Sequence, residues 1–353
     1  MTLITYSSRV HFSDGITEEA IFAEFESSGI HRPILVGDFA SLSPQVSERL
    51  IAALPAWRLG SALDMPVDAA GAALASRIVE AFRDRRADAL VAAGSSRALE
   101  IVRQAHQGFR KIAGRGLPPM LFIPWVYGLP DPQDQAAHSG REQHPELKTS
   151  TVIILDPTLT SDADRHATAS GLATALSRAI EAFLSPAFHP PADGVALSAV
   201  RSAARALRTI DQRADIGWRR DAMAASFGAT LAQEKGAGPV QALVYALSRH
   251  LKGPADGGDL RAVLLPRVLA VRNIPAEQAR LLKEALNLDG DALIAEGIAE
   301  LLRPLGFPQR LSDVGIAETN LELAAIDAEE MVHLWPRNAT LMAGAKSLLA
   351  AAR

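Results

Sequence analysis

The chain has 353 residues, of which 48% are hydrophobic and 22% are charged, and it contains no cysteine. This composition is typical of a soluble globular protein with room for two domains. The net charge of −4 indicates no nucleic-acid or membrane partner, and the lack of cysteine excludes disulfides, zinc–thiolate sites and thiol nucleophiles. No stretch has the apolar length of a signal peptide or a transmembrane helix, so we expect a cytoplasmic protein.

Short apolar runs alternate with helical patterns in the first part of the chain. Strands are expected within 5–15 and at 33–38, 89–94, 120–124 and 151–157. Helices are expected between them, at 17–29, 43–54, 66–87 and 95–109. Strands that alternate with helices predict a parallel sheet with helices on both faces.

The strand patterns stop after Leu159, and the rest of the chain has helical patterns separated by proline and glycine. The first of these helices is expected at 170–186. We therefore predict an α/β, dinucleotide-binding-like domain in residues 1–160. An all-helical domain should follow in residues 161–353.

Several short motifs, in this order, resemble the iron-containing (group III) alcohol dehydrogenases. They are Arg9-Val10-x-Phe12, Asp156-Pro157-Thr158-Leu159-Thr160, the helix frame 175–182, Ala262–Pro266 with Asn273, and the tail 301–316 with Pro336-Arg337. Within the family, the motifs most resemble those of maleylacetate reductases. The resemblance covers nearly the whole chain and implies the dehydroquinate-synthase-like fold, an α/β domain followed by a helical one.

The metal-binding pattern of this family is lost. The resemblance implies four ligand positions, three histidines and one aspartate, and a further histidine as a proton shuttle. The ligand positions carry Thr174, Arg178, Tyr245 and Gly257, and the shuttle position carries Arg249. Hydroxyls, a permanent cation and a glycine cannot replace such a donor set. We therefore expect that the chain binds no metal.

The cofactor pattern is partly kept. The resemblance implies that NAD(H) binds where Asp38 ends a strand, since a carboxylate there accepts hydrogen bonds from the ribose and favours NAD over NADP. The glycine-rich phosphate loop survives as Gly94, Ser95 and Ser96, with one glycine of three. Trp125 replaces a threonine of the family and either stacks on the cofactor or plugs its site. Alternatively, Asp38 is a solvated turn residue and the loop binds nothing.

The replacements at the metal position predict a site for an anion. Arg178 and Arg249 are expected on two facing helices, and paired guanidiniums bind carboxylates, phosphates or a developing oxyanion. Tyr245 lies one helical turn before Arg249 and is a candidate proton donor, because a nearby cation lowers the pKa of a phenol. Alternatively, the arginines only pair with acidic neighbours such as Glu181 and Asp259 and fill a vacated space.

Together these observations predict a metal-independent oxidoreductase resembling maleylacetate reductase, which reduces a small carboxylated carbonyl compound with NAD(P)H. Thr174, His250 and Arg337 are further candidates for substrate binding. The alternative is a non-redox enzyme or a catalytically silent paralogue that binds an anionic small molecule in an arginine–tyrosine cleft, without metal and either with or without a nucleotide. The resemblance implies a homodimer, and a silent paralogue would instead pair with an active subunit.

Overall fold

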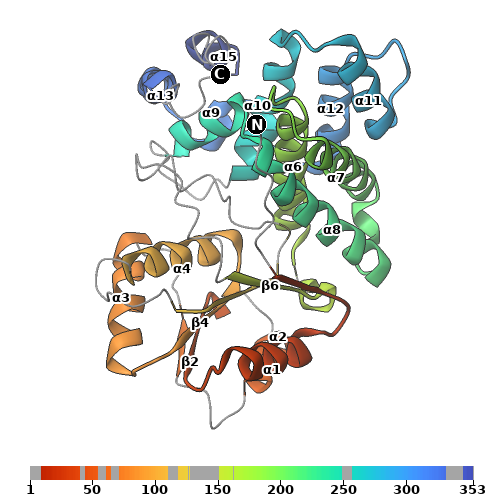
Figure 1. Cartoon of the computed structure of the whole chain (residues 1–353). Coiled ribbons are helices and arrows are strands. Elements are labelled where there is room, and N and C mark those ends of the chain that lie inside the picture. Colours follow the sequence, from red (N-terminus) through yellow and green to blue (C-terminus); the bar gives the residue numbers. More distant parts are fainter. Residues whose placement is uncertain are drawn as a thin grey trace. The chain divides into compact units, whose positions relative to one another are not determined.

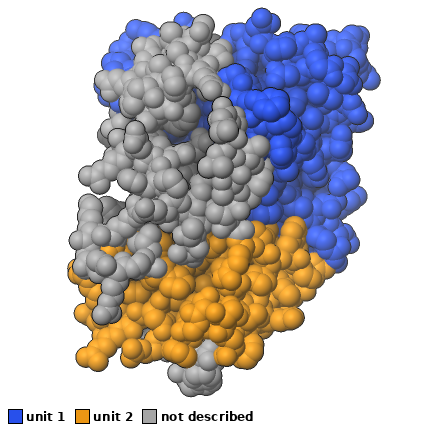
Figure 2. All heavy atoms as spheres, viewed as in Figure 1, with its two compact units in different colours: residues 1–4, 131–143, 164–353 blue, residues 5–130, 144–163 orange. Residues whose placement is uncertain are grey.

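The computed structural model describes residues 9–39, 44–54, 61–64, 71–109, 118–125, 127, 151–161, 163–248, 257–330 and 345–352. These residues form two compact units, which divide after Ala163. Figure 1 shows the elements of each unit. The unit that comes first in the chain is orange in Figure 2 and labelled unit 2 there, and the unit that follows Ala163 is blue and labelled unit 1. None of the described helices combines the length and the apolar character needed to cross a bilayer.

The first unit contains a six-stranded parallel sheet in the order β1-β6-β5-β4-β2-β3. The strands are β1 (Arg9–Phe12), β2 (Pro33–Gly37), β3 (Ser61–Asp64), β4 (Ala89–Gly94), β5 (Met120–Pro124) and β6 (Thr151–Leu155). The helices are α1 (Thr17–Ser28), α2 (Pro44–Ala53), α3 (Gly71–Asp84) and α4 (Ser96–Phe109).

Helices cover both faces of this sheet. Leu35 of β2 packs in one core with Phe25 of α1 and Leu50 of α2. Val36, the next residue of β2, packs in a second core with Val102 of α4. Successive side chains of a strand point to opposite faces, so a strand covered on both sides reads as a continuous apolar run. The predicted parallel α/β architecture is thereby confirmed.

The sequence analysis missed β3. This strand has four residues and pairs only with β2, from Ile34 with Ser61 to Gly37 with Asp64. It forms an edge of the sheet, where strands are often short. With a polar residue at each end, it lacks the apolar run by which β2, β4, β5 and β6 were predicted.

All of the regular secondary structure described in the second unit is helical. Its helices are α6 (Arg165–Phe183), α7 (Pro190–Arg208), α8 (Ile216–Ala232), α9 (Pro239–Ser248), α10 (Gly257–Val271), α11 (Ala276–Leu286), α12 (Ile294–Leu302), α13 (Glu318–Glu330) and α15 (Ala345–Ala351). Helix α6 packs against α7, α8, α9 and α10 (Figure 1). Of its 19 residues 14 are buried, as expected for a helix that neighbours surround.

Helix α6 begins before the predicted residue 170. The Asp164 side chain accepts a hydrogen bond from the Ala167 N–H at 2.8 Å and caps the helix, which then runs from Arg165 to Phe183. The apolar frame indicated the helix correctly, but the extra turn at its start depends on this cap.

Asp156 follows β6 and fastens the start of the first unit to the end of the sheet. Its carboxylate accepts hydrogen bonds from the Gly15 N–H at 2.8 Å, the Thr17 hydroxyl at 2.7 Å and the Thr158 hydroxyl at 2.6 Å. Arg49 Nη2 of α2 lies 3.2 Å from the same carboxylate. Burial alone would raise the pKa of Asp156, but the hydrogen bonds outweigh it and hold the pKa below its usual range.

Candidate functional site

Asp38 and Gly94 are neighbours at the carboxyl ends of β2 and β4, which are paired strands. Asp38 Oδ1 accepts a hydrogen bond from the Ser95 N–H at 3.2 Å. A Cβ atom on Gly94 would lie 2.5 Å from the same oxygen, so this close approach requires glycine. The structure therefore brings together three of the residues predicted to contact a cofactor.

The Asp38 carboxylate lies at the start of α4. The Ser95 hydroxyl accepts a hydrogen bond from the Ala98 N–H at 3.4 Å and caps the first turn of this helix. Negative charge is favourable at a helix N-terminus, and a carboxylate at this edge of a sheet can accept hydrogen bonds from a ribose. Ser96 begins α4, but its side chain lies outside the described part of the structure.

Trp125 follows β5 and is 3% exposed. Its ring belongs to the core on the α1 and α2 side of the sheet and lies 6.4 Å from the ring of Phe39, measured between centroids. A base can stack only on an accessible ring face. This burial therefore favours packing over stacking for Trp125.

Four polar residues share one face of α6: Ser170, Thr174, Arg178 and Glu181, spaced by three or four positions. One end of this face touches α10, where a Cβ atom on Gly258 would lie 2.1 Å from the Ser170 hydroxyl. At the other end, Glu181 binds the start of α9. Thr174 and the buried Arg178 lie between these two contacts, so they are on the face of α6 that is turned to α9 and α10.

Glu181 holds the N-terminus of α9. Its carboxylate accepts hydrogen bonds from the Val240 N–H at 2.6 Å and the Gln241 N–H at 3.0 Å. A Cβ atom on Gly238 would lie 2.2 Å from Glu181 Oε1, so the chain needs glycine where it passes the carboxylate. Burial raises the pKa of Glu181 to about 7, although the two backbone hydrogen bonds and nearby arginines favour the charged form.

Arg261 links α9 to α10. Its Nη2 donates a hydrogen bond to the Gln241 side-chain oxygen, and its Nη1 donates one to the Gly257 carbonyl at 2.9 Å. Arg261 and Gln241 are 5% and 3% exposed. A Cβ atom on Gly257 would lie 2.6 Å from Arg261 Nη1. The half-buried Tyr245 lies one helical turn after Gln241 on α9.

Comparison with known proteins places the chain in a family. Residues 168–343 match the model of the Fe-containing alcohol dehydrogenase family, C-terminal. The chain is 28% identical to the 4-hydroxybutyrate dehydrogenase of Cupriavidus necator, over 90% of this chain and 91% of that protein. The chain belongs to the iron-containing alcohol dehydrogenase family.

Solved structures of this family share the fold. The maleylacetate reductase of Rhizobium sp. strain MTP-10005 superposes with a TM-score of 0.78 at 20% identity, covering 99% of this chain and 97% of that one. The sulfoacetaldehyde reductase of Bifidobacterium kashiwanohense, solved in complex with NAD+, gives 0.79 at 17% identity, covering 100% and 99%. The fold predicted from the sequence is thereby confirmed.

The residues that the sequence analysis assigned to the metal-ligand positions do not fit a metal ion. Arg178 carries a permanent positive charge, Thr174 is neutral, and Gly257 has no side chain. In addition, the Arg261 guanidinium lies where a side chain on residue 257 would begin. Across the described ranges, no three His, Asp or Glu side chains are close enough together to hold a metal ion.

The acidic neighbours considered in the sequence analysis have identified contacts. The Glu181 carboxylate binds the start of α9, as described above, and Asp259 Oδ1 lies 3.1 Å from His166 Nε2. Three predicted site residues, Arg249, His250 and Arg337, lie outside the described residues.

The sequence analysis missed Gln241 and Arg261 as members of this group. A charged residue at position 261, just before the apolar run 262–265 and four residues after Gly257, was the available signal. An arginine in so apolar a stretch needs hydrogen-bond acceptors when it is buried. Its acceptor on α9 could not be identified from sequence spacing.

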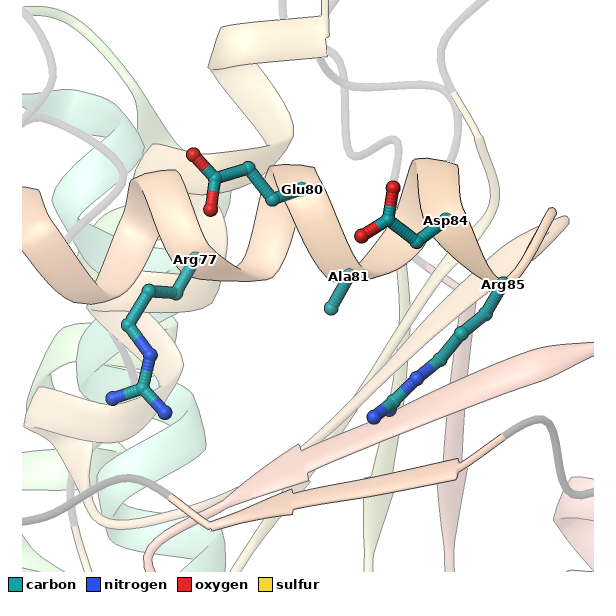
Figure 3. Close-up of a pocket in the computed structure, with 5 residues that line it drawn as sticks. All are labelled: Arg77, Glu80, Ala81, Asp84 and Arg85. Carbon is teal, nitrogen blue, oxygen red and sulfur yellow. The ribbon is translucent and has the colours of Figure 1, made fainter.

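Two surface hollows contain none of the predicted site residues. One, of about 250 Å³, is lined by Arg77, Glu80, Ala81, Asp84 and Arg85. Figure 3 shows the two carboxylates on one side of α3 and the two guanidiniums on the other, so these charges do not converge on a ligand. The other, of about 380 Å³, lies between α10 and α12.

The raised pKa of Glu181 predicts a pH-dependent stability. A folded-state pKa of about 7 lies above the usual unfolded value near 4.3, so the folded chain favours the protonated acid. This contribution is fully present below about pH 4 and is lost as the pH rises through 7. We expect wild type to lose about 3 kcal/mol of unfolding free energy over this range, relative to Glu181→Gln, in urea titrations at several pH values.

The exposed Glu300 of α12 supplies the matched control. Glu300→Gln should leave the pH profile of wild type unchanged. Parallel profiles for wild type and Glu181→Gln would show that folding does not raise the pKa of Glu181.

Proposed function

We propose that the chain is an NAD(H)-linked oxidoreductase of the iron-containing alcohol dehydrogenase type that works without a metal ion. Its substrate is a small carboxylated carbonyl compound, which it reduces to the alcohol. The observation that carries the proposal is the position of Arg178, which is buried on the face of α6 that is turned to α9 and α10. The resemblance assigns a metal ligand to this position.

The cofactor part of the proposal is supported by the cluster of Asp38, Gly94 and Ser95. The carboxylate would accept hydrogen bonds from the adenosine ribose, and the lack of a side chain on Gly94 lets the backbone approach the pyrophosphate. NADH would supply the hydride to the carbonyl carbon. The carboxylate also repels a 2′-phosphate, so NADH should bind more tightly than NADPH.

At the reacting carbonyl, Arg178 would stabilise the oxygen as negative charge develops on it, or hold the substrate carboxylate. Tyr245, on the neighbouring helix α9, would donate the proton that completes the alcohol. Arg249 would add a second positive charge, as predicted from the sequence. Thr174 lies one turn before Arg178 on the same face of α6 and would contact the substrate.

The substrate class is supported by the relative from Cupriavidus necator, whose name describes a 4-hydroxybutyrate dehydrogenase. The corresponding aldehyde, 4-oxobutanoate, carries a carboxylate and a carbonyl group. Such a molecule is suited to a site in which guanidiniums replace a metal ion, because one anionic group and one polarised oxygen need positive partners.

The second candidate function is a non-redox or catalytically silent protein that binds an anionic small molecule. It is favoured by the buried Trp125 and by the Asp38 carboxylate, which already lies at the N-terminus of α4. If that carboxylate only fastens the helix, the phosphate position is taken and no nucleotide binds.

We expect the purified protein to oxidise NADH with 4-oxobutanoate or a related oxo acid, and to keep this activity after dialysis against dipicolinate and EDTA. The reason is that the arginine guanidiniums, as cationic hydrogen-bond donors, would stabilise the carbonyl oxygen in place of a metal ion. Activity that disappears on chelation and returns with Fe²⁺ or Zn²⁺ would contradict the metal-independent mechanism. Absence of any NADH oxidation across small oxo acids would favour the second candidate.

A further inference from the structure

The metal ligands of this family would lie on the three helices that meet around Arg178. Thr174 and Arg178 are on α6, Tyr245 is on α9, and Gly257 begins α10. A metal ion at this position would fasten α6, α9 and α10 to one another. Without a fitting donor set, another group has to hold these helices in place.

Two hydrogen-bonded links join the same three helices. Glu181 of α6 accepts hydrogen bonds from the backbone at the start of α9. On α9, Gln241 accepts a hydrogen bond from Arg261 of α10. The third pair of helices, α10 and α6, is in contact through close packing of Gly258 against Ser170.

Arg261 also occupies the space of the last ligand. Its Nη1 lies 2.6 Å from the position of a Cβ atom on residue 257 and donates to the carbonyl of that residue at 2.9 Å. Any side chain at position 257 would therefore displace the guanidinium from its present position. One residue thus fills the ligand's place and makes the link between α9 and α10.

We propose that Arg261 replaces the metal ion as the group that fastens α9 and the first turn of α10 together. It is a positioning residue, because it acts through Gln241 on the helix that carries Tyr245. The inference rests on the metal-independent form of the proposed function. It implies that a side chain restored at position 257 would displace the Arg261 guanidinium and break its hydrogen bonds to Gln241 and Gly257.

A thermal-unfolding cycle with apolar replacements tests the link. Arg261→Met should lower the Tm by about 10 °C, because two buried acceptors lose their donor. Adding Gln241→Met to the Arg261→Met chain should lower the Tm by less than Gln241→Met lowers the Tm of wild type. The reason is that the hydrogen bond between the two side chains is already absent in the Arg261→Met chain. Arg205→Met is the matched control, since Arg205 is 58% exposed and pairs with Asp221 at 2.6 Å; it should shift the Tm by at most about 2 °C.

A second experiment tests whether Arg261 fills the space beside residue 257, by comparing the effect of Gly257→Ala in wild type and in an Arg261 variant. If Arg261 were important only for its hydrogen bond to Gln241, the two effects would be the same. Gly257→Ala should lower the Tm of wild type, because the new Cβ atom displaces the guanidinium. In an Arg261→Ala chain, the same substitution should be neutral or stabilising, since alanine favours helix over glycine. If the Arg261 variants do not fold, the effect of Gly257→Ala on the Tm of wild type still tests the proposal. A lower Tm supports it, because alanine in place of glycine would otherwise stabilise α10.

The proposal is overturned if Gly257→Ala stabilises both chains equally, or if the effects of Arg261→Met and Gln241→Met simply add. Titration of wild type with NADH separates this result from the proposed function. A coupled Gln241–Arg261 pair in a protein that binds no NADH would retain the helix link and reject the oxidoreductase.

Discussion

Asp156→Ala is expected to lower the free energy of unfolding of the first unit by about 3–5 kcal/mol. The side chain of Asp156 is fully buried, and its carboxylate holds the turn after β1, the start of α1 and Arg49 of α2 at the end of β6. Its removal leaves buried donors without an acceptor, and it leaves the Arg49 charge without this partner. Urea unfolding followed by circular dichroism measures the loss.

Asp88→Ala is the matched control for this substitution. Asp88 also accepts two backbone hydrogen bonds, from the His31 and Arg32 N–H groups at 2.8 and 2.9 Å, but these bonds are exposed to solvent. It should cost about 1 kcal/mol or less. Equal losses for the two variants would show that the buried hydrogen bonds of Asp156 stabilise the fold no more than the exposed ones of Asp88.

The lowered pKa of Asp156 gives the same prediction a pH dependence. A folded-state pKa below the unfolded value of about 3.9 means that the stabilising contribution is present above that pH. It is lost as the pH falls through the folded-state pKa. The difference in stability between wild type and Asp156→Ala should therefore shrink in acid.

Arg178→Ala is expected to reduce kcat/KM for an oxo-acid substrate about 100- to 1000-fold. Arg178 is buried on the face of α6 that is turned to α9 and α10. Its guanidinium is the positive group that we propose to act on the substrate. Steady-state kinetics with NADH as the second substrate measure the loss. Affinity for NADH should change by less than about twofold, because the proposed cofactor residues belong to the other unit.

Arg178→Lys and Arg205→Ala complete this experiment. Lysine keeps the charge but loses the bidentate fork, so it should recover part of the activity. The exposed Arg205 of α7 is outside the proposed site and should be replaceable without effect. Full activity in Arg178→Ala, and likewise in Arg249→Ala, would show that the arginines only fill the vacated space.

Local patterns predicted the elements of the sheet well. The strands at 89–94 and 120–124 occur with the predicted bounds, because strands buried on both faces are continuous apolar runs. Asp38 and Gly94 could be placed together, since the carboxyl ends of neighbouring parallel strands share one edge. The edge strand β3 gave no such signal.

The links of the helical unit could not be predicted in the same way. Glu181 and Val240 are 59 residues apart, and Gln241 and Arg261 are 20 apart, so each contact depends on how the helices pack. The sequence analysis predicted that the ligands of the family are lost, because the family motif assigns each ligand to a position in the sequence. The sequence did not show that Arg261 occupies the space beside Gly257, because residue 261 is not one of the ligand positions in the family motif.

The most direct test of the central claim is a calorimetric titration of the purified protein with NADH and NADPH. We expect micromolar affinity for NADH, weaker binding of NADPH, and loss of the NADH preference in Asp38→Ala, since this carboxylate would bind the ribose and repel the 2′-phosphate. Asp88→Ala should bind as wild type does. No binding of either nucleotide at millimolar concentration would contradict the oxidoreductase, and the protein would then be the anion-binding relative of this family.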